Sequence, residues 1–170
     1  METIAEYNYA KAKLTTLDHA VLVDALLKLA QESPSALMLV NGLISSQEER
    51  IALFRENMHS ITHQGRRNRL SGEQIMDLLK RSLELLDPEQ LDPKLGLALM
   101  EDFYSTDGWA FESTTELDFE FDWLYSKDGL ATFSAFADRC PDADYVQEVL
   151  KRLLASNHYS ARDDLAAFVT

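Results

Sequence analysis

Helix-start signals recur along this chain, and each precedes a run of apolar residues with helical spacing. A serine followed three residues later by glutamate or glutamine can cap a helix from both directions, and a capping side chain followed by proline marks the first helical turn. The signals are Ser46 with Glu49, Ser71 with Gln74, Ser33-Pro34 and Asp92-Pro93. The sequence therefore predicts a series of separately capped helices.

The chain is poor in the residues that make turns, with 6 Gly and 4 Pro among 170 residues. Few breakers favour few, long elements, so we expect an all-α fold of about eight or nine helices with short connections. Short connections make successive helices antiparallel neighbours. The expected architecture is a set of stacked antiparallel helical hairpins, α-solenoid-like in the manner of HEAT or TPR repeats. We expect one helical domain over 1–170.

Several helix boundaries can be predicted from local signals. A first helix is expected over 2–13, and Thr15 or Thr16 is expected to cap the second. A third helix is expected over 34–45. Near the C-terminus, Asp142 is expected to cap a helix, and Ser160 to cap a last short one.

Residues 104–133 fit two secondary structures. Apolar and acidic residues alternate from Leu117 to Trp123, which is the two-residue period of a strand. Leu117, Phe121 and Tyr125 also lie on one face of a helix. A single strand would have no partner elsewhere in the chain, so we predict a helix.

A short sequence echo lies in the same region. Residues 104–110 and 125–131 are identical at five of seven positions, including an Asp-Gly pair. One interpretation is a duplicated binding turn. The other, which we favour, is two helix ends near 105 and 127, each with its glycine just past the last turn.

Composition excludes several classes of function. A net charge of −13 disfavours direct binding to nucleic acid and to anionic lipid, and favours a partner with a basic surface. One cysteine excludes an internal disulfide. The most apolar stretch, 20–30, contains charges and is too short to cross a membrane, so we expect a cytoplasmic protein with no membrane contact.

Residues that could carry chemistry are scattered, and none completes a motif. His59 and His63 have the spacing of two metal ligands on one helix, but no third ligand is spaced for the ion. Residues 118–122 lack the glycine and the last glutamate of a calcium loop. Cys140 has no CxxC partner. We therefore predict no metal, no cofactor and no enzyme activity, and an enzyme with a site that sequence does not reveal is kept as an alternative.

Charge is segregated along the chain. Residues 101–128 contain nine acidic residues and one basic residue, interleaved with eight aromatic ones, whereas 50–81 contain seven basic and three acidic residues. Aromatic side chains beside carboxylates suit docking onto a basic, partly apolar surface. A basic loop can hold an acidic peptide or a phosphate. The candidate binding residues are Trp109, Phe111, Asp118, Glu120, Asp122 and Trp123 in the acidic region, and Arg66, Arg67 and Arg69 in the basic loop.

One segment resembles a known family. The run 22–34 has the form Leu-Val-x-x-Leu-Leu-x-Leu-Ala-x-x-x-Pro, and it is similar to a segment of an uncharacterised bacterial family of all-helical repeat proteins found alone or beside zinc-binding SWIM modules. The resemblance implies a helical repeat fold and no established activity. The chain lacks the ligand cluster of a SWIM module, since it has one cysteine.

The leading hypothesis is a protein–protein interaction or adaptor module whose acidic-aromatic region, 101–128, docks a basic partner. The alternatives are a DNA mimic that inhibits a nucleic-acid-binding protein, and an enzyme. A salt-dependent homo-oligomer is a further hypothesis, in which 50–81 of one copy meets 101–128 of another.

Overall fold

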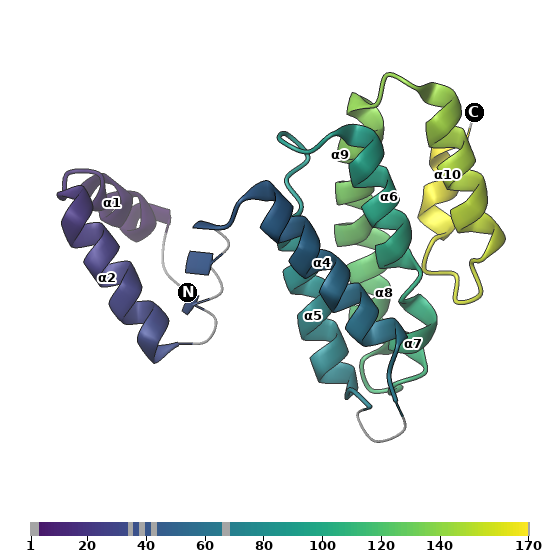
Figure 1. Ribbon diagram of the computed structural model, residues 1–170, viewed down its shortest axis with the longest axis horizontal. Helices are drawn as coiled ribbons and strands as arrows, with labels where there is room; N and C mark the ends of the chain where they lie inside the picture. Colours follow the sequence, from purple (N-terminus) through teal and green to yellow (C-terminus); the bar gives the residue numbers. More distant parts are fainter. Residues whose placement is uncertain (1–3, 34–35, 38–39, 42–43, 66–68, 170) are drawn as a thin grey trace. The chain divides into compact units, whose positions relative to one another are not determined.

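The computed structural model describes residues 4–33, 36–37, 40–41, 44–65 and 69–169 (Figure 1). These residues form helices and loops with no β-strand among them, so the prediction of an all-α fold is confirmed. The chain divides into two compact units, Met1–Ser46 and Gln47–Thr170, which we describe separately as unit 1 and unit 2. The expectation of one domain over 1–170 stays a prediction.

Unit 1 contains helices α1 (Ile4–Leu14) and α2 (His19–Glu32). Asp18 caps α2 by accepting a hydrogen bond of 2.8 Å from the amide of Ala20. The prediction that Thr15 or Thr16 caps this helix is wrong, because both hydroxyls instead donate to carbonyls in the last turn of α1. Half of the expected helix over 34–45 falls outside the described residues.

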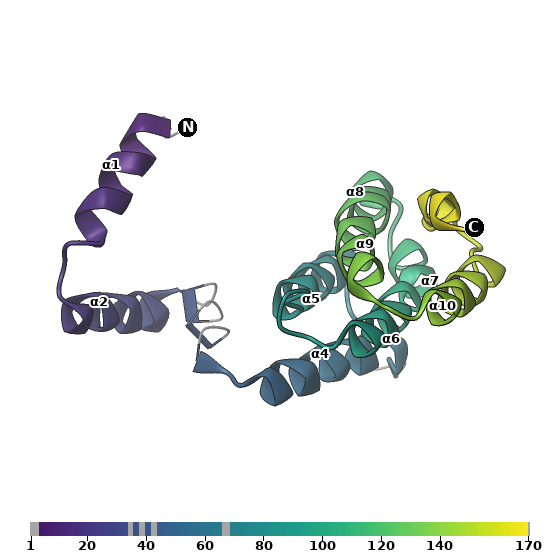
Figure 2. The same ribbon diagram turned by 90° about the horizontal axis from the view of Figure 1, so that it is seen from above.

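Unit 2 begins with a helical hairpin of α4 (Gln47–Thr62) and α5 (Gly72–Leu85), which lie side by side in Figures 1 and 2. The capping box of Ser71 and Gln74 is confirmed, since both of its hydrogen bonds form at the start of α5. Inside the hairpin, Asn57 donates to the hydroxyl of Ser82 over 3.0 Å. This buried polar contact holds the register of two otherwise apolar helix faces.

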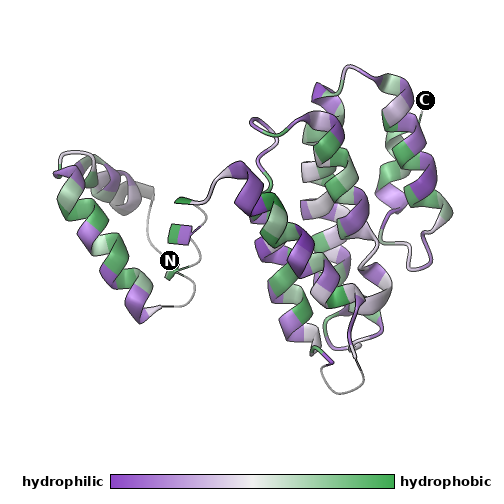
Figure 3. Ribbon diagram, viewed as in Figure 1, coloured by the Kyte–Doolittle hydropathy of each residue, from purple (hydrophilic) through white to green (hydrophobic). Residues whose placement is uncertain are grey.

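Three further helices complete the body of unit 2, namely α6 (Pro93–Tyr104), α9 (Leu130–Arg139) and α10 (Ala143–Ala155). Asp92 and Asp142 cap α6 and α10 as predicted. Helix α6 packs against both α9 and α10, and its apolar side chains form the middle of the core. Figure 3 shows hydrophobic and hydrophilic residues alternating along these helices.

Between α6 and α9 the chain forms two short helices, α7 (Asp107–Phe111) and α8 (Asp118–Trp123). The helical interpretation of 117–125 is therefore confirmed. Helix α8 runs directly into a π-helical turn, η1 (Leu124–Gly129), which continues into α9. Phe121, Leu124 and Tyr125 are buried and attach this segment to the core.

The two echo segments pack against each other. The Tyr104 hydroxyl donates to the Tyr125 carbonyl over 3.0 Å, and the Tyr125 hydroxyl lies 2.7 Å from that of Thr106. A helix does end at Tyr104, but 125–129 lies inside a continuous helix. The expected helix end near 127 is therefore wrong, and no described glycine has the positive φ of a helix-ending residue. Gly129 instead lets the Phe103 ring approach, since an added Cβ would lie 2.9 Å from it.

The C-terminal segment returns to α6, α7 and α10 and ends in a 3₁₀ helix, η2 (Asp163–Phe168). Ser160 has a φ of 59° and does not cap this helix, so that prediction is wrong. The backbone turns at Ser160 so that the side chain of Arg162 enters the protein interior, where it is buried against Asp107.

Candidate interaction surface

The eight aromatic residues of 101–128 divide into a buried and an exposed group. Phe103, Tyr104, Phe121 and Tyr125 are completely buried, and Phe111 is partly buried. Trp109, Phe119 and Trp123 remain 41%, 73% and 54% exposed. Large aromatic side chains this exposed are the feature that distinguishes a docking surface from an ordinary polar surface.

Phe119 and Trp123 form a pair on the outer face of α8. They are separated by four residues, so one helical turn places them on the same side of the helix. Their ring centroids are 6.4 Å apart. Phe121 points the other way, into the core, where its ring lies 5.8 Å from that of Phe111. The buried Phe121 thus holds α8 in place while the pair faces solvent.

Acidic residues alternate with the aromatic residues along α8. Asp118, Glu120 and Asp122 are exposed, and within the described part of the chain no ion pair engages them. Two other acidic residues of 101–128 are neutralised inside unit 2: Glu101 binds Arg152 at 2.7 Å and Asp107 binds Arg162 at 2.8 Å. Seven acidic residues of 101–128 have no ion-pair partner among the described residues, and three of these seven are on α8.

Trp109 and Phe111 belong to α7, a different element. Phe111 stacks on Tyr159 with ring centroids 5.3 Å apart, and the Tyr159 hydroxyl donates to Glu112 over 2.7 Å. Phe111 is therefore a structural contact between α7 and the C-terminal segment more than an open binding residue. No ring contact joins Trp109 or Phe111 to the Phe119–Trp123 pair within the described residues.

The basic loop is described only in part. Arg66 and Arg67 lie outside the described residues. Arg69 is exposed, and its guanidinium donates to the Glu112 carbonyl over 3.4 Å. This contact brings the end of the basic loop to the end of α7.

The two histidines on α4 stack on each other, with ring centroids 3.9 Å apart. His59 also borders a shallow pocket of about 180 Å³ with Arg55, Met58, Thr62, Asp102 and Ser105. Burial raises the pKa of Asp102, and nearby Arg55 opposes that rise. In the described part of the chain, no group of three His, Cys, Asp or Glu side chains could hold a metal ion.

Phe119 is the candidate residue that sequence reasoning left out of the binding set. Its signal was present, because the four-residue spacing from Trp123 and the opposite placement of Phe121 follow once the segment is a helix.

None of the described helices is long and apolar enough to cross a membrane. No protein-family model matches the chain, and no curated protein or solved structure matches it either.

Proposed function

We propose that this protein is an interaction module that docks a basic, partly apolar surface of another protein through α8. The observation that carries the proposal is the exposed Phe119–Trp123 pair between uncompensated carboxylates. A cytoplasmic location and an adaptor role belong to the same proposal. The resemblance of 22–34 to the helical repeat family stays a hypothesis beside it.

The aromatic pair would supply the affinity of such a contact. Half-exposed aromatic rings lose water contact when a partner covers them, and anchors of this type dominate protein–protein binding energy. Since Phe119 and Trp123 already share one helix face, docking requires little further ordering of the chain.

The carboxylates would supply selectivity and orientation. Asp118, Glu120 and Asp122 favour cationic partners and repel acidic ones, and this effect weakens as salt screens the charges. The surrounding charge of unit 2 points the same way, because 47–170 carry −11 of the net −13. DNA mimicry and catalysis have no comparable observation in their favour.

The first test uses two synthetic helical peptides. One is composed of Lys and Leu, and the other of Glu and Leu. The protein carries Trp109→Phe, so that Trp123 is the single tryptophan reporter. We expect the Lys/Leu peptide to shift Trp123 emission to the blue, since the indole leaves water, with an affinity of roughly micromolar order. We expect roughly tenfold weaker binding when Phe119 is replaced by alanine.

Matched variants separate the α8 surface from general acidity. Asp118→Asn with Asp122→Asn should weaken binding, whereas Glu148→Gln with Glu84→Gln, also on exposed residues of unit 2, should not. Phe119→Ala should leave thermal unfolding unchanged, because the ring is already exposed. Equal binding of the Glu/Leu peptide, or unaltered binding by Phe119→Ala, would refute the proposed function.

A further inference from the structure

Helix α2 carries an apolar face, most of which is exposed. At 3.6 residues per turn, its apolar side chains occupy about half of the helix circumference. We name this the α2 face, and it consists of Leu22, Val23, Leu26, Leu27, Leu29 and Ala30. Val23, Leu26, Leu27 and Leu29 are each between 44% and 52% exposed.

The described residues of unit 1 form almost no core of their own. Among its described residues only Ala30, Ala36 and Val40 are buried, and none of them is large. A unit of 46 residues is below the size at which a single core normally suffices, and such units use disulfides, metals or association. The chain's one cysteine is Cys140, outside this unit, and its described residues hold no metal-binding cluster. Association with another surface is a further way to bury these side chains.

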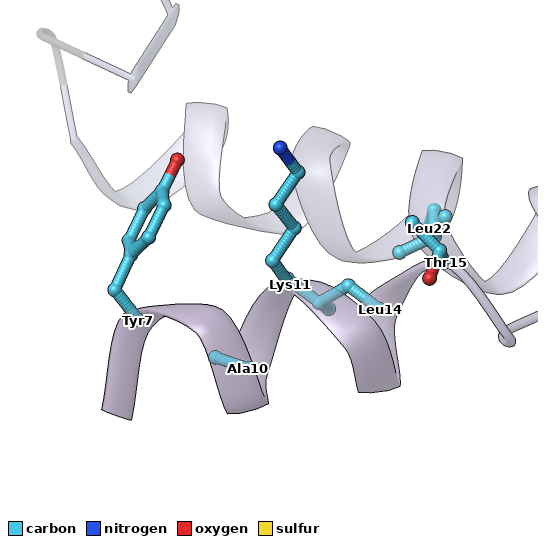
Figure 4. Close-up of a pocket in the computed structure, with 6 residues that line it drawn as sticks. All are labelled: Tyr7, Ala10, Lys11, Leu14, Thr15 and Leu22. Atoms are coloured by element: carbon cyan, nitrogen blue, oxygen red, sulfur yellow. The ribbon is translucent and has the colours of Figure 1, made fainter. Parts of the chain in front are cut away.

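A groove between α1 and α2 continues this apolar surface. It has a volume of about 430 Å³, and Tyr7, Ala10, Lys11, Leu14, Thr15 and Leu22 line it. Figure 4 shows Tyr7, Ala10, Lys11 and Leu14 on α1, with Leu22 contributed by α2. The groove is open and mostly apolar, so side chains of a facing helix can enter it.

We propose that the α1–α2 hairpin pairs with the same hairpin of a second copy, forming a four-helix bundle. The α2 face contains no charged residue, so pairing two such faces buries no charged side chain of α2. Unit 1 has five acidic and three basic residues, a net −2 of the chain's −13. Charge repulsion between two copies is therefore weaker at unit 1 than at unit 2.

The available area matches that of a dimer. The exposed parts of the α2 face, together with Tyr7, Leu14 and Leu17, add up to roughly 700 Å² in each copy, or roughly 1,400 Å² in a pair, within the range of standard-size interfaces. A two-fold pairing places identical faces together, and the wide stripe of leucines is typical of bundles with more than two helices.

Two valines on opposite sides of α2 provide a matched test. Val23 lies on the α2 face, whereas Val21 lies about 160° away around the axis, beside Asp24 and Lys28. The two side chains are 49% and 53% exposed, so their replacements have similar intrinsic costs. We would measure the mass of the full chain by sedimentation equilibrium over a range of concentrations, for the wild type, Val23→Glu and Val21→Glu.

We expect a reversible dimer for the wild type and for Val21→Glu, and roughly 100-fold weaker dimerisation for Val23→Glu, since two charges enter an apolar interface. The dimer should persist at about 0.5 M salt, where a contact between 50–81 and 101–128 would weaken.

A wild-type monomer, or equal effects of the two variants, overturns the proposal. If the wild type is a monomer and Val23→Glu lowers its thermal stability, the α2 face is covered within the chain. If the monomeric wild type binds neutral lipid vesicles, the α2 face contacts a membrane. Phe119→Ala should leave the dimer intact, so the outcome is independent of the α8 proposal.

Discussion

Arg162 shows how one residue can join four parts of unit 2. Its five N–H groups have acceptors on Asp107, Leu153, Ser156 and Tyr104, at distances from 2.6 to 2.9 Å. The other oxygen of Asp107 accepts the Gly108 amide over 2.7 Å. Burial raises the pKa of Asp107, and Arg162 opposes that rise. A buried charge is tolerated here because nearly every polar group of the pair is satisfied.

The first stability prediction compares two arginines. Arg162→Met should lower the free energy of unfolding by about 3–5 kcal/mol, because it leaves the Asp107 carboxylate buried without its partner. Arg152→Met removes the exposed pair with Glu101 and should cost less than about 1 kcal/mol. Urea unfolding monitored by circular dichroism provides both values. Similar losses for the two variants would show that the buried network has no special role.

At the scale of elements, close helix contacts in unit 2 depend on small residues. Gly96 of α6 faces the ring of Phe136 of α9, and an added Cβ would overlap that ring. Both residues are buried, so the ring has little freedom to move aside. The position of Gly96 therefore sets how closely α6 and α9 approach, and α9 in turn continues η1 and α8.

Replacing two helical glycines by alanine tests this contact. Gly96→Ala should destabilise unit 2 by about 1–3 kcal/mol, since overpacking outweighs the gain in helix propensity. At Gly108 in α7 an added Cβ would meet only Tyr159, at 3.5 Å, so Gly108→Ala should be neutral or stabilising by up to about 1 kcal/mol. Thermal unfolding of both variants measures these changes in stability. If Gly96→Ala left stability unchanged, α6 and α9 could move apart without loss of stability, which would contradict the prediction.

At the scale of the whole molecule, charge and polar burial are distributed unequally. The exposed carboxylates of α8 face solvent, whereas the buried phenols of Tyr104 and Tyr125 lie in the core of unit 2. Thr106 donates its hydroxyl proton to the Phe103 carbonyl over 2.6 Å, so the Tyr125 hydroxyl is the donor to Thr106. Burial raises the pKa of both tyrosines well above the ordinary value near 10.

The raised pKa values of Tyr104 and Tyr125 predict that the protein unfolds at alkaline pH. The folded state keeps two protons that the unfolded state releases above about pH 10, so stability is complete below that pH and falls as the pH rises. Tyrosinate absorbance and circular dichroism should show that two of the six tyrosines ionise only as the helices of unit 2 unfold. Tyr125→Phe should reduce the decline with pH. Ionisation of all six in an intact fold would contradict the prediction.

Local signals in the sequence determined the starts of α5, α6 and α10, because a cap and its amide lie within three residues of each other. Ser71 with Gln74, Asp92 and Asp142 are examples. The same rule failed at Thr15 and Thr16, where Asp18 stands next to the helix and competes as a better acceptor. It also failed at Ser160, whose backbone is set by the distant contacts of Arg162.

The sequence alone also located the acidic and aromatic region, since composition is independent of folding. Helix spacing separates Phe119 from Phe121, but only the tertiary structure decided which of the two sides of α8 is exposed, because the two residues differ in their neighbours and not in their chemistry. It likewise decided that Glu101 and Asp107 are paired while the α8 carboxylates are not, through arginines 51 and 55 residues away along the chain. Charge and helix periodicity are properties of short segments, whereas burial depends on contacts between segments that only the folded chain brings together.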